Sequence, residues 1–124
     1  VEERNLIVLE VVLELKQGSR TEIEERMKEL AEARRSKQPL EYPSAGSTFK
    51  RPEGYFAGKL IMDAGLRGYS VGGAEVAEKH CGFVVNKGGA TAEDVQRLIE
   101  DVHRIVKDKF GVELEPEVKM LGDF

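Results

Sequence analysis

The sequence predicts an α+β domain in which a mixed β-sheet carries helices packed mainly on one face. Apolar residues recur with a helical period in two long stretches, near residues 19–36 and 91–110. Short apolar runs and alternating stretches elsewhere are typical of strands. Because helices lie between strands along the chain, we expect a βαβ-type crossover, so that not every strand pair is antiparallel.

The N-terminal stretch is expected to form a strand followed by a helix. Residues 5–15 alternate, and one face of the predicted strand is fully apolar. Capping-box signatures within residues 19–24 begin a helix that runs to about Ser36, and Pro39 marks its end. The residues expected on the buried face of this helix are Ile23, Met27 and Leu30.

A loop at residues 42–52 is the centre of the predicted site. Prolines stand near both of its ends, and small residues at 44–46 let another molecule approach the backbone closely. Ser47 offers a hydroxyl there, and Lys50 and Arg51 follow with positive charge. This combination suits an anionic ligand, although a serine in such a loop can also do no more than satisfy a turn.

The middle of the chain is expected to contain a short helix and two short strands. The helix covers residues 55–64 with Phe56, Leu60 and Ile61 inward, and Gly65 ends it in the left-handed conformation. Residues 69–71 form a strand that runs into Gly72-Gly73, where close backbone contact or unusual dihedral angles are required.

The second short strand covers residues 83–85, and Asn86 follows it, just before Gly88-Gly89. Asn86 is either a turn-forming residue or a ligand contact.

The C-terminal part is expected to form a long helix and a last strand. Thr91 caps the helix and Gly111 stops it. Its buried stripe consists of Val95, Leu98, Ile99, Val102, Ile105, Val106 and Phe110. His103 lies off that stripe and is expected to be exposed. Residues 112–121 then alternate as a strand that places Glu117 on its polar face.

Composition bounds the class of protein. A chain of 124 residues is one domain with room for its own core, and a net charge of −4 argues against nucleic acid or an anionic membrane as partner. The single cysteine, Cys81, excludes an internal disulfide, and His80 beside it is better explained by packing than by a nucleophile pair. With no apolar run of transmembrane length and no signal-peptide pattern, we expect a cytoplasmic location.

Several motifs resemble one enzyme family. The run that begins at Tyr42 and includes Lys59 and Asn86 (YPSAGSTFKRPEGYFAGKLI…AGLRGYSVGGAEVAEKHCGFVVNKGGATAEDV) is similar to UDP-N-acetylenolpyruvoylglucosamine reductase, also called UDP-N-acetylmuramate dehydrogenase. So is the ending, residues 110–118. The resemblance is to the C-terminal, substrate-binding part only. It implies that residues 1–124 are a single substrate-binding domain of a longer flavoenzyme, whose FAD-binding region is missing from this sequence.

The resemblance implies roles for five residues. Ser47 would donate a proton to substrate carbon, and Glu117, protonated in the complete site, would stabilise the enolate-like intermediate. Lys37 would contact the diphosphate of the nucleotide, and Asn86 would lie near the substrate. Arg51 stands where some members have asparagine, and its contact with phosphate or with solvent stays open.

The resemblance also implies cofactors and partners. In the family, NADPH reduces FAD, and the reduced flavin delivers hydride to UDP-N-acetylglucosamine enolpyruvate in peptidoglycan precursor synthesis. We expect no cofactor on this chain alone, which should therefore be inactive without the FAD-binding domains of the same enzyme. The alternative is a stand-alone nucleotide-sugar binding module without catalysis.

Overall fold

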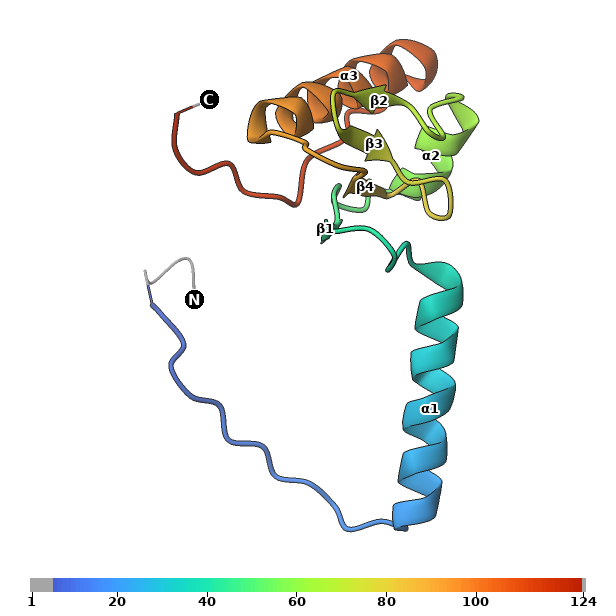
Figure 1. Cartoon of the computed structure of the whole chain (residues 1–124), viewed down its shortest axis with the longest axis vertical. Coiled ribbons are helices and arrows are strands. Elements are labelled where there is room, and N and C mark those ends of the chain that lie inside the picture. Colours follow the sequence, from blue (N-terminus) through green and yellow to red (C-terminus); the bar gives the residue numbers. More distant parts are fainter. Residues whose placement is uncertain (1–5, 124) are drawn as a thin grey trace. The chain divides into compact units, whose positions relative to one another are not determined.

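The computed structural model describes residues 6–123, and the chain divides into two compact units, Val1–Glu32 and Ala33–Phe124. The described elements are α1 (Arg20–Lys37), β1 (Ser44–Ser47), α2 (Ala57–Asp63), β2 (Ser70–Val71), β3 (Ala74–Val76), β4 (Phe83–Asn86) and α3 (Ala92–Phe110) (Figure 1). The predicted α+β class is confirmed.

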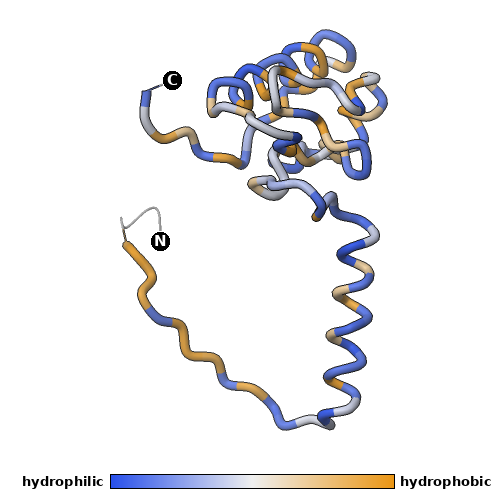
Figure 2. Tube along the Cα trace, in the orientation of Figure 1, coloured by the Kyte–Doolittle hydropathy of each residue, from blue (hydrophilic) through white to orange (hydrophobic). Residues whose placement is uncertain are grey.

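Residues 6–15 do not form the predicted strand. The segment has no regular structure, and its apolar side chains are exposed, Leu9 to 92%. Figure 2 shows it as an almost continuous hydrophobic stretch. The alternating pattern is present, but no other described segment pairs with it, and an isolated strand is not stable in water. The first residue of the predicted strand, Asn5, lies outside the described residues.

Helix α1 forms where the sequence predicts it, but its predicted buried face is wrong. Ile23, Met27 and Leu30 are 48%, 65% and 52% exposed. Local ion pairs on its exposed surface, such as that between Arg20 and Glu24, add a small stabilisation. Three basic residues in its last turn, Lys37 among them, complement the helix dipole.

The sheet has the order β1-β4-β3-β2, and all three strand pairs are antiparallel. The predicted mixed sheet with a βαβ-type crossover is therefore wrong. The reason is the two-residue turn Gly72-Gly73, which joins β2 directly to β3 as a hairpin. The segment that contains α2 connects β1, at one edge of the sheet, to β2 at the opposite edge.

The predicted loop at residues 42–52 contains strand β1, which the sequence did not indicate. Its pairing with β4 shifts register between Ser44 and Ser47, as at a β-bulge. Gly46 lies within the irregularity at φ +86°, a conformation that few other residues adopt. The small-residue run thus bends an edge strand, and Ser47 is its last residue.

One face of the sheet carries helices α2 and α3, as predicted. Ala74, Val76 and Val84 face a single core with α2 and α3, whereas Phe83 and Val85 lie on the opposite face. The fully buried members of the core with the largest side chains are Ile61, Leu98, Leu114, Val76, Val102 and Val106. Phe56, predicted inward, is 61% exposed, because it is the residue before the first turn of α2.

Helix α3 is capped at both ends as predicted. Thr91 and Asp94 form a reciprocal capping box, and Gly111 ends the helix at φ +68°. Two predictions for this helix are wrong. Phe110 is 42% exposed at its last position, and His103 is half-buried with Nδ1 2.7 Å from the carbonyl oxygen of Leu114.

Residues 112–121 form only one bridge, between Phe49 and Pro116, in place of the predicted strand. Lys50 N–H donates to the Glu115 carbonyl, and Glu117 N–H donates to the Thr48 carbonyl. These two hydrogen bonds flank Pro116, and no further bridge continues the ladder along residues 112–121. The segment still runs beside residues 48–50 and places Glu117 there.

Candidate functional site

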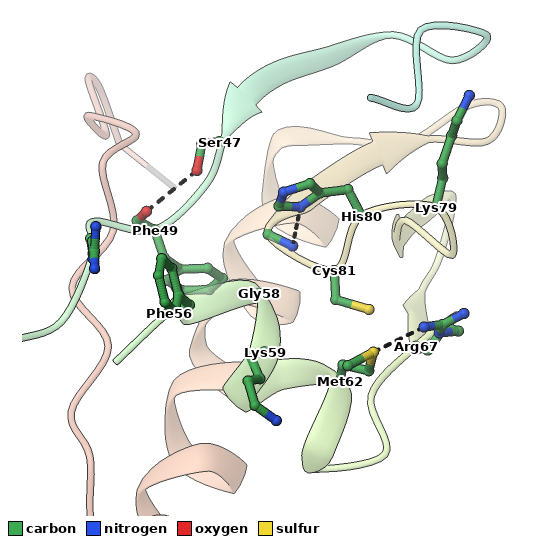
Figure 3. A pocket seen from close by; sticks show the side chains of 13 residues that line it. Ser47, Phe49, Phe56, Gly58, Lys59, Met62, Arg67, Lys79, His80 and Cys81 are labelled. Atoms are coloured by element: carbon green, nitrogen blue, oxygen red, sulfur yellow. Dashed lines mark hydrogen bonds between the residues drawn. The ribbon is translucent and has the colours of Figure 1, made fainter. Parts of the chain in front are cut away.

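A cavity of about 490 Å³ opens beside Ser47 in the second unit. Its walls come from the end of β1 and the residues after it, from α2, and from the loop that leads into β4 (Figure 3). We call it the Ser47 cavity. Its polar and charged lining residues are Ser47, Arg51, Lys59, Arg67, Lys79 and His80.

The lining of the Ser47 cavity is positively charged. Arg51, Lys59, Arg67 and Lys79 contribute four cations, and no aspartate or glutamate of the described residues lines it. This is unusual for a chain whose net charge is −4. Such a cavity favours an anionic ligand, because cations lining a partly enclosed space attract it without a competing carboxylate on the wall.

Each of these cations has a partner within the chain. Arg51 lies over the Phe56 ring, 4.2 Å from its centroid, and Lys59 pairs with Asp63 at 2.8 Å. Arg67 Nη2 lies 3.0 Å from the sulfur of Met62. All are exposed, so these contacts are weak enough for a ligand to replace.

Ser47 stands at the rim of this cavity with little to hold its hydroxyl. The side chain is exposed, and Oγ donates to the Phe49 carbonyl at the long distance of 3.5 Å. Figure 3 draws this hydrogen bond as a dashed line between Ser47 and Phe49. The hydroxyl can therefore rotate toward a ligand at small cost, because a bond at that distance contributes little.

His80 and Cys81 do not form a nucleophile pair. His80 Nδ1 accepts the Gly82 N–H at 3.0 Å, and the ring packs edge-on against Phe83. Cys81 is buried, and this burial raises the pKa of its thiol, an effect that the Arg67 guanidinium only partly opposes. The thiol is therefore protonated at neutral pH, as expected of a packing residue.

The structure brings some of the predicted site residues together. Ser47 and Arg51 line the same cavity. Glu117 lies on the adjacent segment, where its backbone N–H donates to the carbonyl of Thr48 at 2.8 Å. The pKa of Lys50 is raised, mainly because its Nζ donates a hydrogen bond to the Glu115 carboxylate at 2.6 Å. The negative charge of Glu117 adds a smaller rise in the pKa of Lys50.

Asn86 and Lys37 lie elsewhere. Asn86 Oδ1 accepts the N–H groups of Gly88 and Ala90, at 2.9 and 3.2 Å, so its carbonyl oxygen shapes the turn after β4. It lines a different cavity of about 340 Å³, together with residues of β1 and Val118. Lys37 is the exposed last residue of α1 and lines none of the described cavities.

Sequence reasoning missed three of the cavity's basic residues, Arg67, Lys79 and His80. They lie on loops that flank the β2–β3 hairpin, and only the tertiary fold brings these loops toward Ser47. The basic pair Lys79-His80 was the one local signal that could have indicated them.

The N-terminus of α3 is occupied by its own residues. Asp94 Oδ2 accepts the Thr91 N–H at 3.0 Å, and Thr91 Oγ1 accepts the Asp94 N–H at 3.1 Å. A carboxylate at that position opposes the binding of a diphosphate there.

Within the described residues, no group of three His, Cys, Asp or Glu side chains could hold a metal ion. None of the described helices is long and apolar enough to cross a membrane.

Comparison with known proteins identifies the class to which this α+β unit with its cationic cavity belongs. Residues 38–121 match the model of the family described as UDP-N-acetylenolpyruvoylglucosamine reductase, C-terminal domain. The chain belongs to this family, as the resemblance indicated.

Similar full-length proteins carry the same name. The chain is 63% identical over 99% of its length to UDP-N-acetylenolpyruvoylglucosamine reductase of Lachnoclostridium phytofermentans, and 66% identical over its whole length to that of Agathobacter rectalis. It spans about 40% of the length of each relative.

A solved structure is similar too. The crystal structure of UDP-N-acetylenolpyruvylglucosamine reductase (MurB) from Thermus caldophilus matches 84% of this chain and 37% of its own, with a TM-score of 0.66 and 40% identity.

Proposed function

We propose that this chain is the substrate-binding and proton-donating part of a UDP-N-acetylenolpyruvoylglucosamine reductase. Its substrate would be UDP-N-acetylglucosamine enolpyruvate and its product UDP-N-acetylmuramate. One observation carries the proposal: an exposed serine hydroxyl stands at the rim of a cavity lined by four cations. A substrate with a diphosphate and a carboxylate is an anion of the kind that such a cavity attracts.

FAD, reduced by NADPH and held outside the described residues, would supply the hydride. The part of the reaction that falls to this chain is the proton. When hydride adds to one alkene carbon, negative charge develops at the other and spreads into the carboxylate. The Ser47 Oγ–H bond then breaks as the new C–H bond forms. A hydroxyl is a weak acid, but a carbanion-like centre is a far stronger base, so the transfer runs downhill.

The surrounding residues would bind and orient the substrate. Arg51 shares the Ser47 cavity and can exchange its contact with the Phe56 ring for a phosphate or carboxylate oxygen. Glu117, on the segment beside Thr48, would have to be protonated to stabilise the enolate-like charge, because a carboxylate there would oppose it. Lys37 and Asn86 would reach the substrate from outside the cavity.

The experiment is transient kinetics on the complete reductase with Ser47→Ala. Reduction of the flavin by NADPH should stay nearly unchanged, and its reoxidation by substrate should slow by orders of magnitude. The matched control is Ser44→Ala, which removes a hydroxyl from the same strand outside the Ser47 cavity. Equal reoxidation rates in Ser47→Ala and the parent protein would remove Ser47 from the mechanism.

Binding is tested separately by an NMR titration of the chain with UDP-N-acetylglucosamine enolpyruvate. Amide shifts that cluster around Ser47, Arg51 and His80 support the proposed site. A well-folded sample without shifts would contradict autonomous substrate binding by this chain.

A further inference from the structure

The side chain of Lys79 connects the Ser47 cavity to the end of helix α1. Its Nζ donates a hydrogen bond to the carbonyl oxygen of Arg35 at 2.5 Å, although the two residues are 44 positions apart in the sequence. The other three cations of the cavity contact residues no more than five positions away. Figure 3 shows the Lys79 side chain pointing away from Met62 and Arg67. Of the four cations, Lys79 therefore holds a separate element.

The carbonyl group that Lys79 binds has no donor within its own helix. In a continued helix the carbonyl of Arg35 would accept the N–H of residue 39, but Pro39 has no N–H. A helix end of this kind is satisfied by a side chain or by water, and here Lys79 supplies the donor. The helix dipole alone does not account for the contact, because Arg34, Arg35 and Lys37 already stand in the last turn and repel a further cation.

The loop between β3 and β4, which carries Lys79, is itself held by backbone hydrogen bonds. The Ala77 N–H donates to the Phe83 carbonyl at 2.9 Å, and the Phe83 N–H donates to the His80 carbonyl at 3.0 Å. Pro39 is buried, and together with Ala77 and Lys79 it lines a second cavity of about 380 Å³. The last turn of α1 and this loop are thus parts of one contact within the second unit.

This contact bears on Lys37, which follows Arg35 by two positions. Lys37 lines none of the described cavities, yet the proposed function gives it a contact with the diphosphate of the substrate. A lysine is a compact charge on a flexible stem, so its reach depends on where its backbone is held. Because successive residues of a helical turn are fixed relative to each other, holding the carbonyl of Arg35 also holds the backbone of Lys37. A helix end that is ordered before the ligand arrives favours affinity, because less conformational freedom is lost on binding.

We propose that Lys79 is a positioning residue for substrate binding. By its hydrogen bond to the Arg35 carbonyl it holds the last turn of α1, and with it Lys37, where Lys37 contacts the diphosphate of the substrate. Lys79 acts through Lys37 and does not itself touch the substrate. The inference rests on the proposed function for the identity of the substrate and for the role of Lys37.

The test is calorimetric titration of the complete reductase with UDP-N-acetylglucosamine enolpyruvate in the absence of NADPH, so that the substrate binds without turning over. Lys79→Met should raise the Kd about fivefold, within the range of coupling between neighbouring residues. Lys79→Arg keeps a donor for the Arg35 carbonyl and should stay within about twofold of the parent protein. At saturating substrate, flavin reoxidation should be unchanged in both variants. Unchanged affinity in Lys79→Met, or slowed reoxidation at saturation, would overturn the inference.

A double-mutant cycle separates positioning from direct contact. If Lys79 acts through Lys37, the double variant Lys37→Met with Lys79→Met should bind no more weakly than Lys37→Met alone. Additive losses would overturn the inference, because Lys79 would then contact the substrate independently. Unchanged affinity in Lys37→Met would overturn it too, because Lys79 would have nothing to position.

Lys107→Met is the matched control for the loss of one positive charge. Lys107 is an exposed lysine that pairs with Glu113 and lines none of the described cavities. Its variant should leave the Kd within about twofold of the parent value, and a loss equal to that of Lys79→Met would refute a specific contact. Ser47→Ala tests the proposed catalytic role through flavin reoxidation alone, so failure of that role is distinguishable from failure of this inference.

Discussion

Gly73 lies where a side chain cannot fit, and Gly73→Ala is therefore expected to be strongly destabilising. The residue is in the turn between β2 and β3, and its carbonyl accepts the Lys87 N–H at 2.9 Å. A Cβ at this position would lie 2.4 Å from the Gly88 carbonyl oxygen and 2.5 Å from the Ala90 nitrogen. Both are backbone atoms, so no side chain can rotate away to make room.

The expected cost is about 3 kcal/mol. Overpacking in a rigid environment costs roughly 1–3 kcal/mol, and the upper end applies because the turn after β4 must move as a whole. That movement also disturbs the hydrogen bond from the Ala90 N–H to Asn86 Oδ1. Gly89→Ala is the matched control, because Gly89 has φ +67° and nothing within 4 Å of an added Cβ. It should cost only the left-handed conformation, about 1 kcal/mol.

Urea unfolding followed by circular dichroism separates the two variants. With a slope of about 2 kcal/mol per molar urea, the midpoint should fall by about 1.5 M for Gly73→Ala and about 0.5 M for Gly89→Ala. Equal shifts would refute the steric argument, because the crowded Cβ at Gly73 would then cost no more than the Cβ at Gly89, which has nothing within 4 Å. Movement of the Asn86 amide resonances in Gly73→Ala, and not in Gly89→Ala, would report the displaced turn directly.

Three further predictions concern the second unit. Thr48→Val should lower the free energy of unfolding by about 1–3 kcal/mol in the same assay, because it leaves the buried Val84 N–H without its acceptor. Thr48→Ser keeps the hydroxyl and should cost no more than about 1 kcal/mol. Equal costs for the two variants would contradict this role of the hydroxyl. Leu98→Ala should cost about 2–5 kcal/mol, since the side chain is fully buried in the core, and a smaller value would mean that the core collapses around the cavity. The backbone N–H of Thr91 holds the pKa of Asp94 below its ordinary value, so the unfolded chain takes up this proton more readily than the folded one. The stabilisation by the Asp94 carboxylate is complete above its ordinary pKa of about 4 and is lost as the pH falls through the lowered pKa. Asp94→Asn should therefore flatten the acid limb of a plot of the free energy of unfolding against pH. An unchanged acid limb would refute this role of Asp94.

The sequence predicted those parts of the fold that depend on local signals. Helix α3 was predicted from its capping residues and its apolar stripe, and both caps are present. Strand β4 was predicted from the short apolar run at residues 83–85, which is also a local signal. The sequence analysis did not predict the pairing direction, because Gly72-Gly73 constrains the backbone in more than one topology, and only the pairing of β2 with β3 makes it the turn of a hairpin.

Neither of the two alternating segments forms the strand that its pattern predicts. Residues 6–15 have a strand's pattern but no partner among the described residues, and a sheet requires a partner. Residues 112–121 have a neighbour in residues 48–50, yet their pairing is confined to the one bridge between Phe49 and Pro116. Alternation therefore predicted the burial of Leu114 and the exposure of Glu117, but not the 39% exposure of Met120 or the absence of regular pairing.

For the candidate site, the sequence indicated Ser47 and Arg51 and missed most of the cations around them. Ser47 was indicated by local chemistry, namely small residues and positive charge close to a hydroxyl. Arg67 and Lys79 carry no such local signal, because each is an ordinary surface cation until the fold brings its loop to the same cavity. Charge that converges from separate loops is a tertiary property.

Thr48 explains how the predicted proton donor and the predicted enolate stabiliser come to be neighbours. Its N–H donates to the Gly82 carbonyl, its hydroxyl accepts the Val84 N–H, and its carbonyl accepts the Glu117 N–H. One residue, 2% exposed, thus fixes the end of β1 against β4 and against the C-terminal segment. Ser47 precedes it directly, so the backbone positions of both proposed catalytic residues depend on the same buried hydrogen bonds. Both side chains are exposed, as the proposed roles toward a substrate require.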